Sequence, residues 1–428
     1  MTDRRTAWRT GGAACALLLG AAAFAQGGAS AQDGVLDLSG ELSVAAGLAD
    51  GAAAGDADAL IRAEGTTILK SGLELGAGTA LRLDGQRPHQ TYAGGRYSSL
   101  LSGGTRGVGP QDGDLFLEGA YLFARGGLGS VYLGRDDGVA SRLAVTSPSI
   151  FRSVRISDWR TDLTGLNDVH TVNDFSGTAT KVTYMPPTGL FGGVIGQFQV
   201  GLSYAPRLAD CGADACAPEE GYVALVSQGG VPVAVPAAQQ GWRDVVEAAL
   251  YYQNDIDVDG DALNVGLGAS FVRAEEDGPR PEDGPSNVFG LDDYRAYAFG
   301  VNLNYGPLTV GGSVKSTNAG LASAEQGEDY LAFDAGVTYE AGDWNFMLGY
   351  GAADAERDAR LLVGPQTAAP LPYALDRRTQ TAQAGVSKVL GQGVRLGVAA
   401  QFVDSDKPDP LGGKEDAAAI VLESSIRF

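Results

Sequence analysis

The residues that most often carry out catalysis are scarce in this sequence. Histidine occurs only at His89 and His170, and both positions lie in segments that read as loops. The spacings His-Glu-x-x-His, Cys-x-x-Cys and Gly-x-Ser-x-Gly, which would indicate a zinc protease, a redox pair or a serine hydrolase, do not occur. We therefore expect that the protein is not an enzyme and has no cofactor.

One acidic stretch has the spacing of a calcium-binding loop. Asp255, Asp257, Asp259 and Gly260 match the first half of such a loop, but its twelfth position is Gly266, where a bidentate glutamate is required. Because that ligand is missing, the stretch reads better as a tight acidic turn between two strands. We expect no metal there.

The remaining chemistry is electrostatic and centres on segment 136–177. Its acids are Asp136, Asp137, Asp158, Asp162, Asp168 and Asp174, and its arginines are Arg142, Arg152, Arg155 and Arg160. Rings of charged side chains set the ion preference of a pore. Each residue alone could equally be a solvated loop charge, so its meaning depends on where the fold places the segment.

The amino-terminal segment has the organisation of a secretory signal peptide. Three arginines (Arg4, Arg5 and Arg9) precede a short apolar run, Gly11–Ala25, and Ala29-Ser30-Ala31 satisfies the small-residue rule for cleavage. We expect residues 1–31 to be removed and residues 32–428 to form the mature protein; Ala23-Phe24-Ala25 is a second candidate site.

Export also bears on the cysteines. Cys211 and Cys216 are the thiols that remain after cleavage, and they lie in one long connection. An oxidising compartment favours a disulfide between them. Its closed loop is too short to stabilise the fold greatly.

The mature sequence favours an all-β protein. It has no run of about 20 apolar residues, which a membrane-spanning helix requires, and it shows almost no helical periodicity between its strand-like segments. Over the full 428 residues glycine is abundant, at 63 residues, and the formal net charge is −21. Sixteen segments alternate apolar with polar residues: 35–46, 59–70, 73–84, 114–124, 130–135, 178–185, 198–206, 243–252, 262–273, 294–305, 308–316, 329–340, 344–352, 378–389, 394–403 and 416–428.

The connections between these segments alternate in length. Ser71-Gly72 and Gly306-Pro307 are examples of the short ones, whereas 85–113, 136–177, 207–242, 274–293 and 353–377 are long, acidic and rich in glycine and proline. Transmembrane barrels have short turns on one rim and long loops on the other. The alternation therefore predicts a 16-stranded antiparallel transmembrane β-barrel.

The apolar faces of the strands should point outward. In 262–273 the apolar set is Leu263, Val265, Leu267, Ala269 and Phe271, and in 344–352 it is Trp344, Phe346, Leu348 and Tyr350. Sixteen strands enclose too wide a lumen for side chains to fill, so these faces are expected to contact lipid. Charged residues on the strands then face the lumen, since an arginine facing lipid at mid-membrane would cost about 2–4 kcal/mol.

The final segment fits the same scheme. Ile420, Leu422, Ser424, Ile426 and Phe428 share one face, and the charged residues share the other. A terminal aromatic residue suits the interfacial girdle of a barrel, and the closing strand must pair with the first one. A strand at the edge of a soluble sandwich that happens to end on phenylalanine is the alternative.

The chain resembles the general diffusion porins of Gram-negative outer membranes over essentially the whole mature sequence. The resemblance rests on Val131-Tyr132-Leu133-Gly134-Arg135-Asp136-Asp137, on Lys181-Val182-Thr183-Tyr184, on Ala384-Gly385-Val386-Ser387-Lys388 and on the Phe428 end. It implies a homotrimer in the outer membrane, in contact with lipid and lipopolysaccharide. It also implies that the barrel assembly machinery recognises Phe428. Nucleic acid is not an expected partner.

The same resemblance implies that the third long loop folds inward and narrows the pore. The loop acids listed above would then face a basic wall made of Arg62, Lys70, Arg82, Arg395 and Arg427. The expected function is passive diffusion of small hydrophilic solutes and ions. The alternative is a non-conducting surface barrel that acts as an adhesin or receptor through its long loops, and an outward-folded third loop would favour it.

Overall fold

The computed structural model describes most of the barrel-forming sequence. The described residues are 34–49, 52–84, 114–157, 163–164, 166–177, 179–188, 196–208, 223–228, 231–236, 242–276, 293–318, 330–355, 360–364, 367–370, 377–391, 393–406 and 413–428. The expected signal peptide, the expected Cys211–Cys216 disulfide, Asp158 and Asp162 lie outside these ranges. No described helix is long and apolar enough to cross a membrane.

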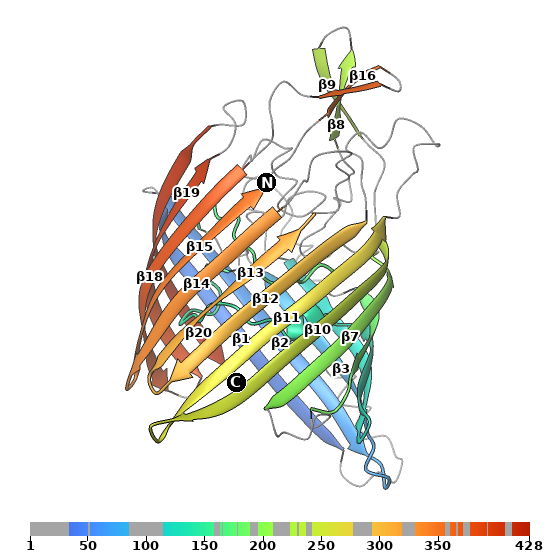
Figure 1. Cartoon of the computed structure of the whole chain (residues 1–428), viewed down its shortest axis with the longest axis vertical. Helices are drawn as coiled ribbons and strands as arrows, with labels where there is room; N and C mark the ends of the chain where they lie inside the picture. Colours follow the sequence, from blue (N-terminus) through green and yellow to red (C-terminus); the bar gives the residue numbers. More distant parts are fainter. Residues whose placement is uncertain are drawn as a thin grey trace, which may run out of the picture.

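Sixteen strands form one closed barrel (Figure 1). In order around the barrel they are β1 (Val35–Ala49), β2 (Ala52–Ile68), β3 (Glu74–Asp84), β4 (Asp114–Gly126), β5 (Gly129–Arg135), β6 (Thr180–Met185), β7 (Gln197–Arg207), β10 (Trp242–Val258), β11 (Asp261–Glu276), β12 (Tyr294–Tyr305), β13 (Leu308–Thr317), β14 (Tyr330–Ala341), β15 (Trp344–Ala355), β18 (Arg377–Gly391), β19 (Val394–Asp406) and β20 (Glu415–Arg427). Neighbouring strands pair antiparallel. The predicted barrel is confirmed, and several strands extend further than their alternation indicated.

The barrel closes between its first and last strands. β20 pairs with β1 from Ala419 opposite Ala49 to Arg427 opposite Glu41. Phe428 continues the pairing, because its amide donates to the Gly40 carbonyl over 3.0 Å and its carbonyl accepts from the Gly40 amide over 2.9 Å. Closure leaves no strand edge unpaired in lipid, where each unpaired backbone group would cost several kcal/mol.

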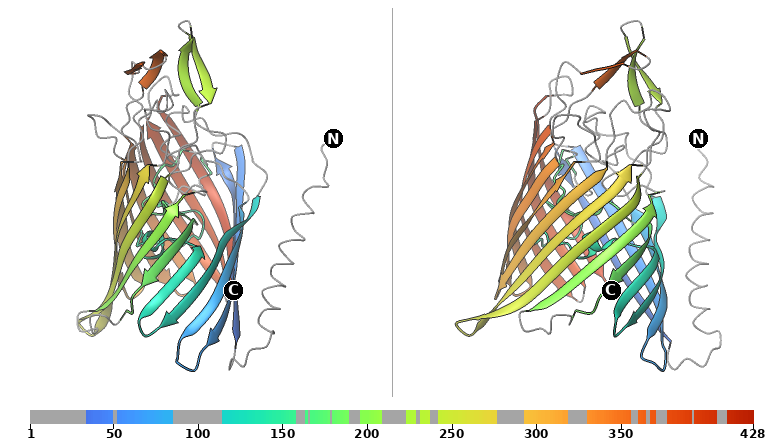
Figure 2. Two further views of the ribbon diagram at one scale, coloured as in Figure 1. Left: turned by 90° about the vertical axis from the view of Figure 1, so that its right-hand side faces the viewer. Right: turned by 45° about the vertical axis from the view of Figure 1, so that its right-hand side comes forward.

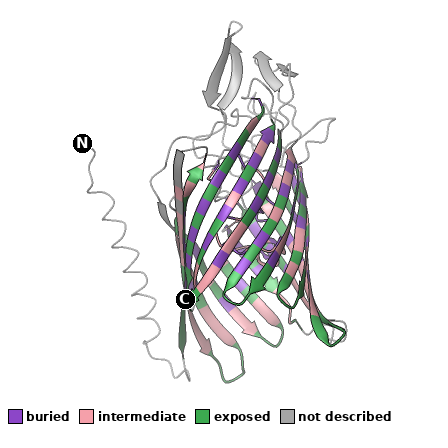
Figure 3. Ribbon diagram, turned by 90° about the vertical axis from the view of Figure 1, so that its left-hand side faces the viewer, coloured by how far each residue is buried: buried purple, intermediate pink, exposed green. Residues whose placement is uncertain are grey.

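The two faces of the barrel alternate as predicted. On β20, Ile420 and Leu422 are exposed whereas Val421 and Glu423 are buried. On β15 the exposed side chains are Trp344, Phe346, Leu348 and Tyr350, and the buried ones between them are Asn345 and Met347. The alternation of exposed and buried residues is visible along the strands in Figure 3. The apolar face therefore points outward, toward lipid.

The rim near the carboxyl terminus carries short turns. Asp259 and Gly260 join β10 to β11 with φ values of 56° and 92°, which is the conformation that a two-residue hairpin turn requires. The Gly260 amide donates to the Asp257 carboxylate over 2.9 Å. The acidic stretch is therefore a tight turn, as predicted.

Four strands were not predicted. β8 (Val223–Gln228) and β9 (Val231–Pro236) lie between β7 and β10, and β16 (Arg360–Gly364) and β17 (Thr367–Pro370) lie between β15 and β18. They form a separate sheet in the order β17-β16-β8-β9, beyond one end of the barrel (Figure 1). Prolines within and beside these short runs obscure them, because proline cannot donate to a sheet ladder. The sheet links two connections that are distant in sequence.

Candidate functional site

One irregular segment runs inside the barrel. Between the end of β5 at Arg135 and the start of β6 at Thr180, the residues that the structure describes include one short helix, α2 (Val139–Arg142). We call residues 136–177 the constriction loop. Its hydrogen bonds reach Ser203 in β7 and Glu41 in β1, strands that lie far apart around the closed barrel. The described parts of the loop therefore contact inward-facing side chains on both sides of the barrel, and the trace of the segment lies within the barrel in Figure 2.

Buried carboxylates on the barrel wall hold the loop backbone. Glu423 of β20 accepts hydrogen bonds from the amides of Arg152, Ser153 and Val154 over 2.7, 2.9 and 3.2 Å. It also accepts the Ser153 hydroxyl over 2.8 Å. These bonds satisfy three consecutive loop amides that have no partner in regular secondary structure. Ionised acceptors make such bonds roughly twice as strong as neutral ones.

Two further acids, on β14 and β10, hold other parts of the loop. Asp334 of β14 accepts the Ser147 amide over 2.7 Å and the Thr171 hydroxyl over 2.8 Å. Glu247 of β10 accepts the amide of Ala140 in α2 over 3.3 Å. Asp334 and Glu247 are 2% and 1% exposed. Asp334 therefore connects two parts of the loop to the wall, and Glu247 connects the short helix to it.

Glycines on inward-facing positions let the loop lie close to the wall. A Cβ at Gly397 would come within 2.6 Å of the Phe151 ring, and one at Gly351 within 2.6 Å of the Ile156 side chain. The same relation holds between Gly268 and Val145, at 2.9 Å. Only glycine permits so close an approach of side chain to backbone. The wall under the loop is therefore recessed by the absence of side chains.

An apolar cluster fills the space between the loop and this wall. Phe175 of the loop stacks on Tyr294 of β12 with ring centroids 3.6 Å apart and meets Trp242 of β10 edge-on at 5.5 Å. Ile150, Phe151, Val154, Ile156 and Val169 are also buried members of the cluster. The loop thus has a hydrophobic core of its own inside the barrel, which the sequence analysis did not predict.

The contacts divide the inner surface into two parts. The inward faces of β7, β10–β15 and β18–β20 contact the loop, and we call them the covered wall. For β2, β3 and β4 the described ion pair with the loop is that of Arg62 with Asp137, at the loop start, and we call their inward faces the open wall. β1, which Arg152 reaches through Glu41, lies between the two walls. In the described part of the chain, the open wall is therefore the side on which we expect a passage through the barrel.

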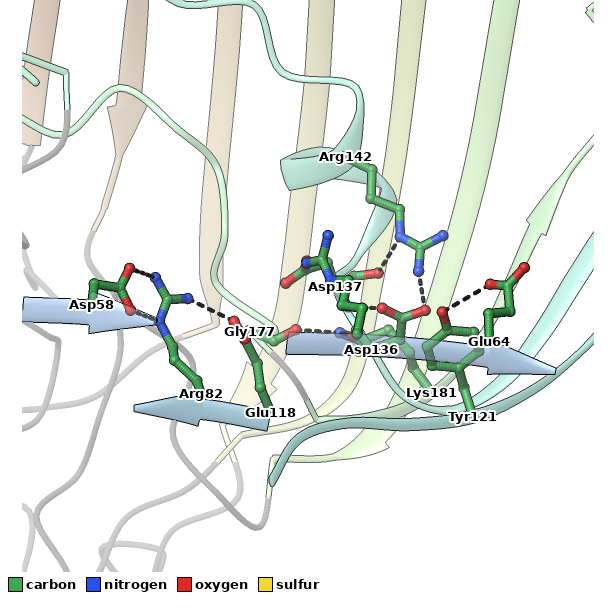
Figure 4. Close-up of polar contacts among 11 residues, drawn as sticks. Asp58, Glu64, Arg82, Glu118, Tyr121, Asp136, Asp137, Arg142, Gly177 and Lys181 are labelled. Carbon is green, nitrogen blue, oxygen red and sulfur yellow. Dashed lines mark hydrogen bonds and ion pairs between the residues drawn. The ribbon is translucent and has the colours of Figure 1, made fainter. Parts of the chain in front are cut away.

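The open wall carries an arginine held between two carboxylates. Arg82 of β3 donates through Nε and Nη2 to Asp58 of β2, over 2.9 and 2.7 Å, and through Nη1 to Glu118 of β4, over 2.7 Å. These side chains are drawn in Figure 4. All three are inward-facing; Arg82 and Asp58 are partly exposed, whereas Glu118 is buried. The guanidinium therefore bridges three adjacent strands.

A second arginine repeats this arrangement nearer the short-turn rim. Arg125 of β4 forms ion pairs with Glu64 of β2 and Glu74 of β3 at 2.8 and 2.9 Å, and its Nε donates to the Tyr132 hydroxyl over 3.2 Å. Its guanidinium also lies 3.9 Å from the ring centroid of Phe123. The ring and the acids together fix the position of this cation.

The start of the constriction loop adds charges at the edge of the open wall. Arg62 of β2, the most exposed arginine here at 50% of its side chain, lies 3.7 Å from Asp137. Arg142 pairs with Asp136. Burial would lower the pKa of the Arg142 guanidinium, but the adjacent Asp136 and Asp137 outweigh it and raise that pKa. Arg142 is therefore a permanent positive charge.

The structure separates the acids expected at the constriction. Asp136 and Asp137 face the arginines beside the open wall. Asp174 is buried and contacts His170 at 2.8 Å, so it supports the interior of the loop. The carbonyl of Asp168 accepts the Tyr330 hydroxyl over 2.6 Å. The four loop acids that the structure describes thus do not form one row.

The expected basic wall is also divided. Arg62 and Arg82 lie on the open wall. Arg395 lies under the loop and donates to the Ile150 carbonyl over 2.8 Å, and Arg427 is exposed at the rim where β20 ends. The placement of Lys70 on a strand was wrong, because β2 ends at Ile68 and Lys70 lies in the turn that follows.

Sequence reasoning missed the acids of the open wall. Asp58, Glu64, Glu74 and Glu118 all face inward beside arginines. The signal was present on β2, where Asp58, Arg62 and Glu64 have the even spacing that places residues on one face of a strand. The sequence analysis assigned a role on the wall to basic residues of these strands and to none of the acids beside them.

Comparison with known protein families identifies the chain. The family model for Gram-negative porins matches residues 13–408. The chain belongs to the Gram-negative porin family. It is thus a channel-type barrel of the outer membrane. No curated protein matched the sequence in a separate search.

Solved structures of outer-membrane proteins share the fold of this porin at low sequence identity. The trimer form of OmpT from Vibrio cholerae has 12% identity and a TM-score of 0.52, covering 93% of this chain and 100% of its own. An anion-selective porin from Comamonas acidovorans has 16% identity and a TM-score of 0.50, covering 92% and 100%. OmpF of Salmonella typhi, in complex with daunomycin, has 14% identity and a TM-score of 0.51, covering 92% and 97%.

Proposed function

We propose that the protein is a porin for passive diffusion of small hydrophilic solutes and ions. The observation that carries the proposal is the contrast between the two walls. The constriction loop is fixed against the covered wall, whereas charged side chains of the open wall remain partly exposed. A polar lumen narrowed on one side suits hydrated solutes, which pass without a specific binding step.

The test is reconstitution of the folded protein into planar bilayers and liposomes. We expect steady ohmic conductance steps, and rates of liposome swelling that fall smoothly as the size of the test sugar increases. Heat-denatured protein in the same vesicles is the control. Intact β-structure without conductance would contradict the proposal and favour the surface adhesin or receptor.

The inward position of the loop argues against the adhesin. A receptor surface built from the third loop would need that loop outside, yet the amides of Val139, Ser147 and Arg152 donate to side chains of the inner wall. The small sheet formed by β8, β9, β16 and β17 is the described feature that could present such a surface instead. Deleting it should leave conductance unchanged if diffusion is the function.

We further propose that the channel is a homotrimer, by analogy with the neighbouring OmpT trimer form. Phe428 is proposed as the recognition point for barrel assembly. Its ring lies over Gly40 on the outer face and is 64% exposed, which suits an aromatic side chain at the membrane interface. Outer-membrane lipid and lipopolysaccharide are the surroundings proposed for that face.

A further inference from the structure

We infer that the pore prefers cations, and that Asp58 and Glu118 are residues that determine this preference. The inference rests on the proposed diffusion function and specifies its ion selectivity. The fold does not decide the sign of the charge, since an anion-selective porin shares it. The side chains of the open wall must decide it.

The first step of the argument concerns the charge of the Arg82 group. One guanidinium accompanies two carboxylates, those of Asp58 and Glu118, and both lie within 2.7 Å of its nitrogens. The group therefore carries a net negative charge when both acids are ionised. An ion that passes it meets an excess of carboxylate oxygens.

The second step concerns the donors of the arginine. Nε, Nη1 and Nη2 of Arg82 all donate to carboxylates, so the guanidinium is already bound bidentately, in the geometry that it would use for a passing anion. The guanidinium therefore holds the two acids in place, and its Nε, Nη1 and Nη2 already donate to carboxylates instead of to a passing anion. An arginine without such partners would have the opposite effect on selectivity.

The third step is that the arrangement repeats along the pore. Arg125 accompanies Glu64 and Glu74 in the same ratio of one base to two acids. Arg62, between the two groups on β2, has Asp137 as its ion-pair partner. Among these described arginines of the open wall, Arg62 therefore has one acidic partner, and Arg82 and Arg125 have two each. Rings or rows of carboxylates favour cations.

The test is the zero-current potential across a bilayer that separates two potassium chloride concentrations. Wild-type protein should give a potassium-to-chloride permeability ratio above one. The double variant Asp58→Asn/Glu118→Gln should lower that ratio by ~3-fold, because it removes two charges close to the ion path in water. Arg82→Gln should raise it, which a merely structural role for this group would not do.

A matched control exists on the outer face. Asp354 accepts two hydrogen bonds from Arg378, just as Asp58 does from Arg82, but Asp354 and Arg378 face away from the lumen. Asp354→Asn should leave the permeability ratio unchanged. Heat-modifiable migration on gels verifies that each variant is folded.

The outcomes separate this inference from the proposed function. A wild-type ratio at or below one, or a ratio unchanged in both the Asp58/Glu118 and Arg82 variants, overturns the inference and leaves the diffusion channel in place. Absence of any conductance overturns the proposed function itself.

Discussion

The covered and open walls are built from the same kind of strand, yet their acidic side chains differ in exposure and in the groups that they bind. On the covered wall, isolated acids such as Glu423 are 2% exposed and accept backbone amides of the loop. On the open wall, acids such as Asp58 keep about a quarter of their side chain exposed and accept from arginine. The two walls differ in what the acids bind. On the covered wall Glu423 accepts hydrogen bonds from main-chain amides. On the open wall two carboxylates share the single guanidinium of Arg82.

Small residues show the same contrast. The covered wall uses glycine at positions such as Gly351 and Gly397 to make room for loop side chains. On the open wall Gly76 and Gly78 make room for the rings of Phe123 and Tyr121, which lie flat on the barrel itself. Glycine therefore gives space to loop side chains on the covered wall and to the barrel's own rings on the open wall.

The largest effect is expected from removing a carboxylate of the covered wall. Glu423→Ala leaves three loop amides without their acceptor, and each buried unsatisfied donor costs about 1–3 kcal/mol. We expect the free energy of unfolding to fall by ~3 kcal/mol and single-channel current to become noisier as the loop loosens. Urea unfolding and bilayer recording measure the two effects.

Glu340→Ala is the matched control for that prediction. Glu340 also faces inward, from β14, but it is exposed near the short-turn rim. Its removal should change neither stability nor current noise. Equal effects of the two substitutions would contradict the role of Glu423 in holding the loop backbone.

A smaller effect should follow from filling the glycine recess. Gly385→Ala places a methyl group against the Phe151 ring, and overpacking of this kind costs typically about 1–3 kcal/mol. Gly65→Ala on β2 is the control, because nothing lies within 4 Å of a Cβ there. We expect a lowered unfolding midpoint for the first variant alone. A Gly385 variant as stable as the control would show that the loop does not need the recess.

The pairing of β1 with β20 closes the barrel. We expect a change there to affect assembly more than the channel itself. Deleting Phe428 removes its two backbone hydrogen bonds to Gly40 and the ring above it. We expect ~2-fold less folded, heat-resistant trimer in outer membranes, since an interfacial ring and its packing contribute on the order of 1 kcal/mol. The conductance of a channel that has formed should change little. Deleting Gly412, in the connection before β20, is the comparison; equal trimer levels in both deletions would refute the role of the terminal residue.

The smallest effect is predicted for the cysteines, which belong to neither wall. Cys211 and Cys216 lie in the connection between β7 and β10. We expect them to be disulfide-bonded in isolated outer membranes, and reduction to leave conductance unchanged. Thiol labelling before and after reduction measures this. Two free thiols in freshly isolated membranes would be the contrary result.

The sequence predicted the barrel because its signals are periodic and local. Alternation along segments such as Trp344–Ala352, and the unequal lengths of the connections, follow from the requirements of lipid and of a closed sheet. The inward fold of the third long loop was predicted from the resemblance to the porin family and not from the residues of the loop. Its apolar core was missed because Ile150, Phe151 and Val154 have no strand or helix period.

The details of the charged site depended on neighbours that are far apart in the sequence. Arg82 meets Asp58 and Glu118 only because strand register aligns β2, β3 and β4, with a bulge between Ala80 and Leu81. Register cannot be read from one strand at a time. Lys70 was misplaced for a simpler reason, since its strand ends two residues earlier than alternation suggested.

The measurement that tests the central claim most directly is the accessibility of a single cysteine on each wall. In a Cys211→Ser/Cys216→Ser background, Leu60→Cys places a thiol on the inward face of β2, beside Arg82. Ala399→Cys places one on the inward face of β19, where Ala399 is 1% exposed beneath the loop. A charged, bulky thiol reagent should block current only in the Leu60 variant. Block in the Ala399 variant with no effect at Leu60 would contradict the claim that the passage lies between the constriction loop and the open wall.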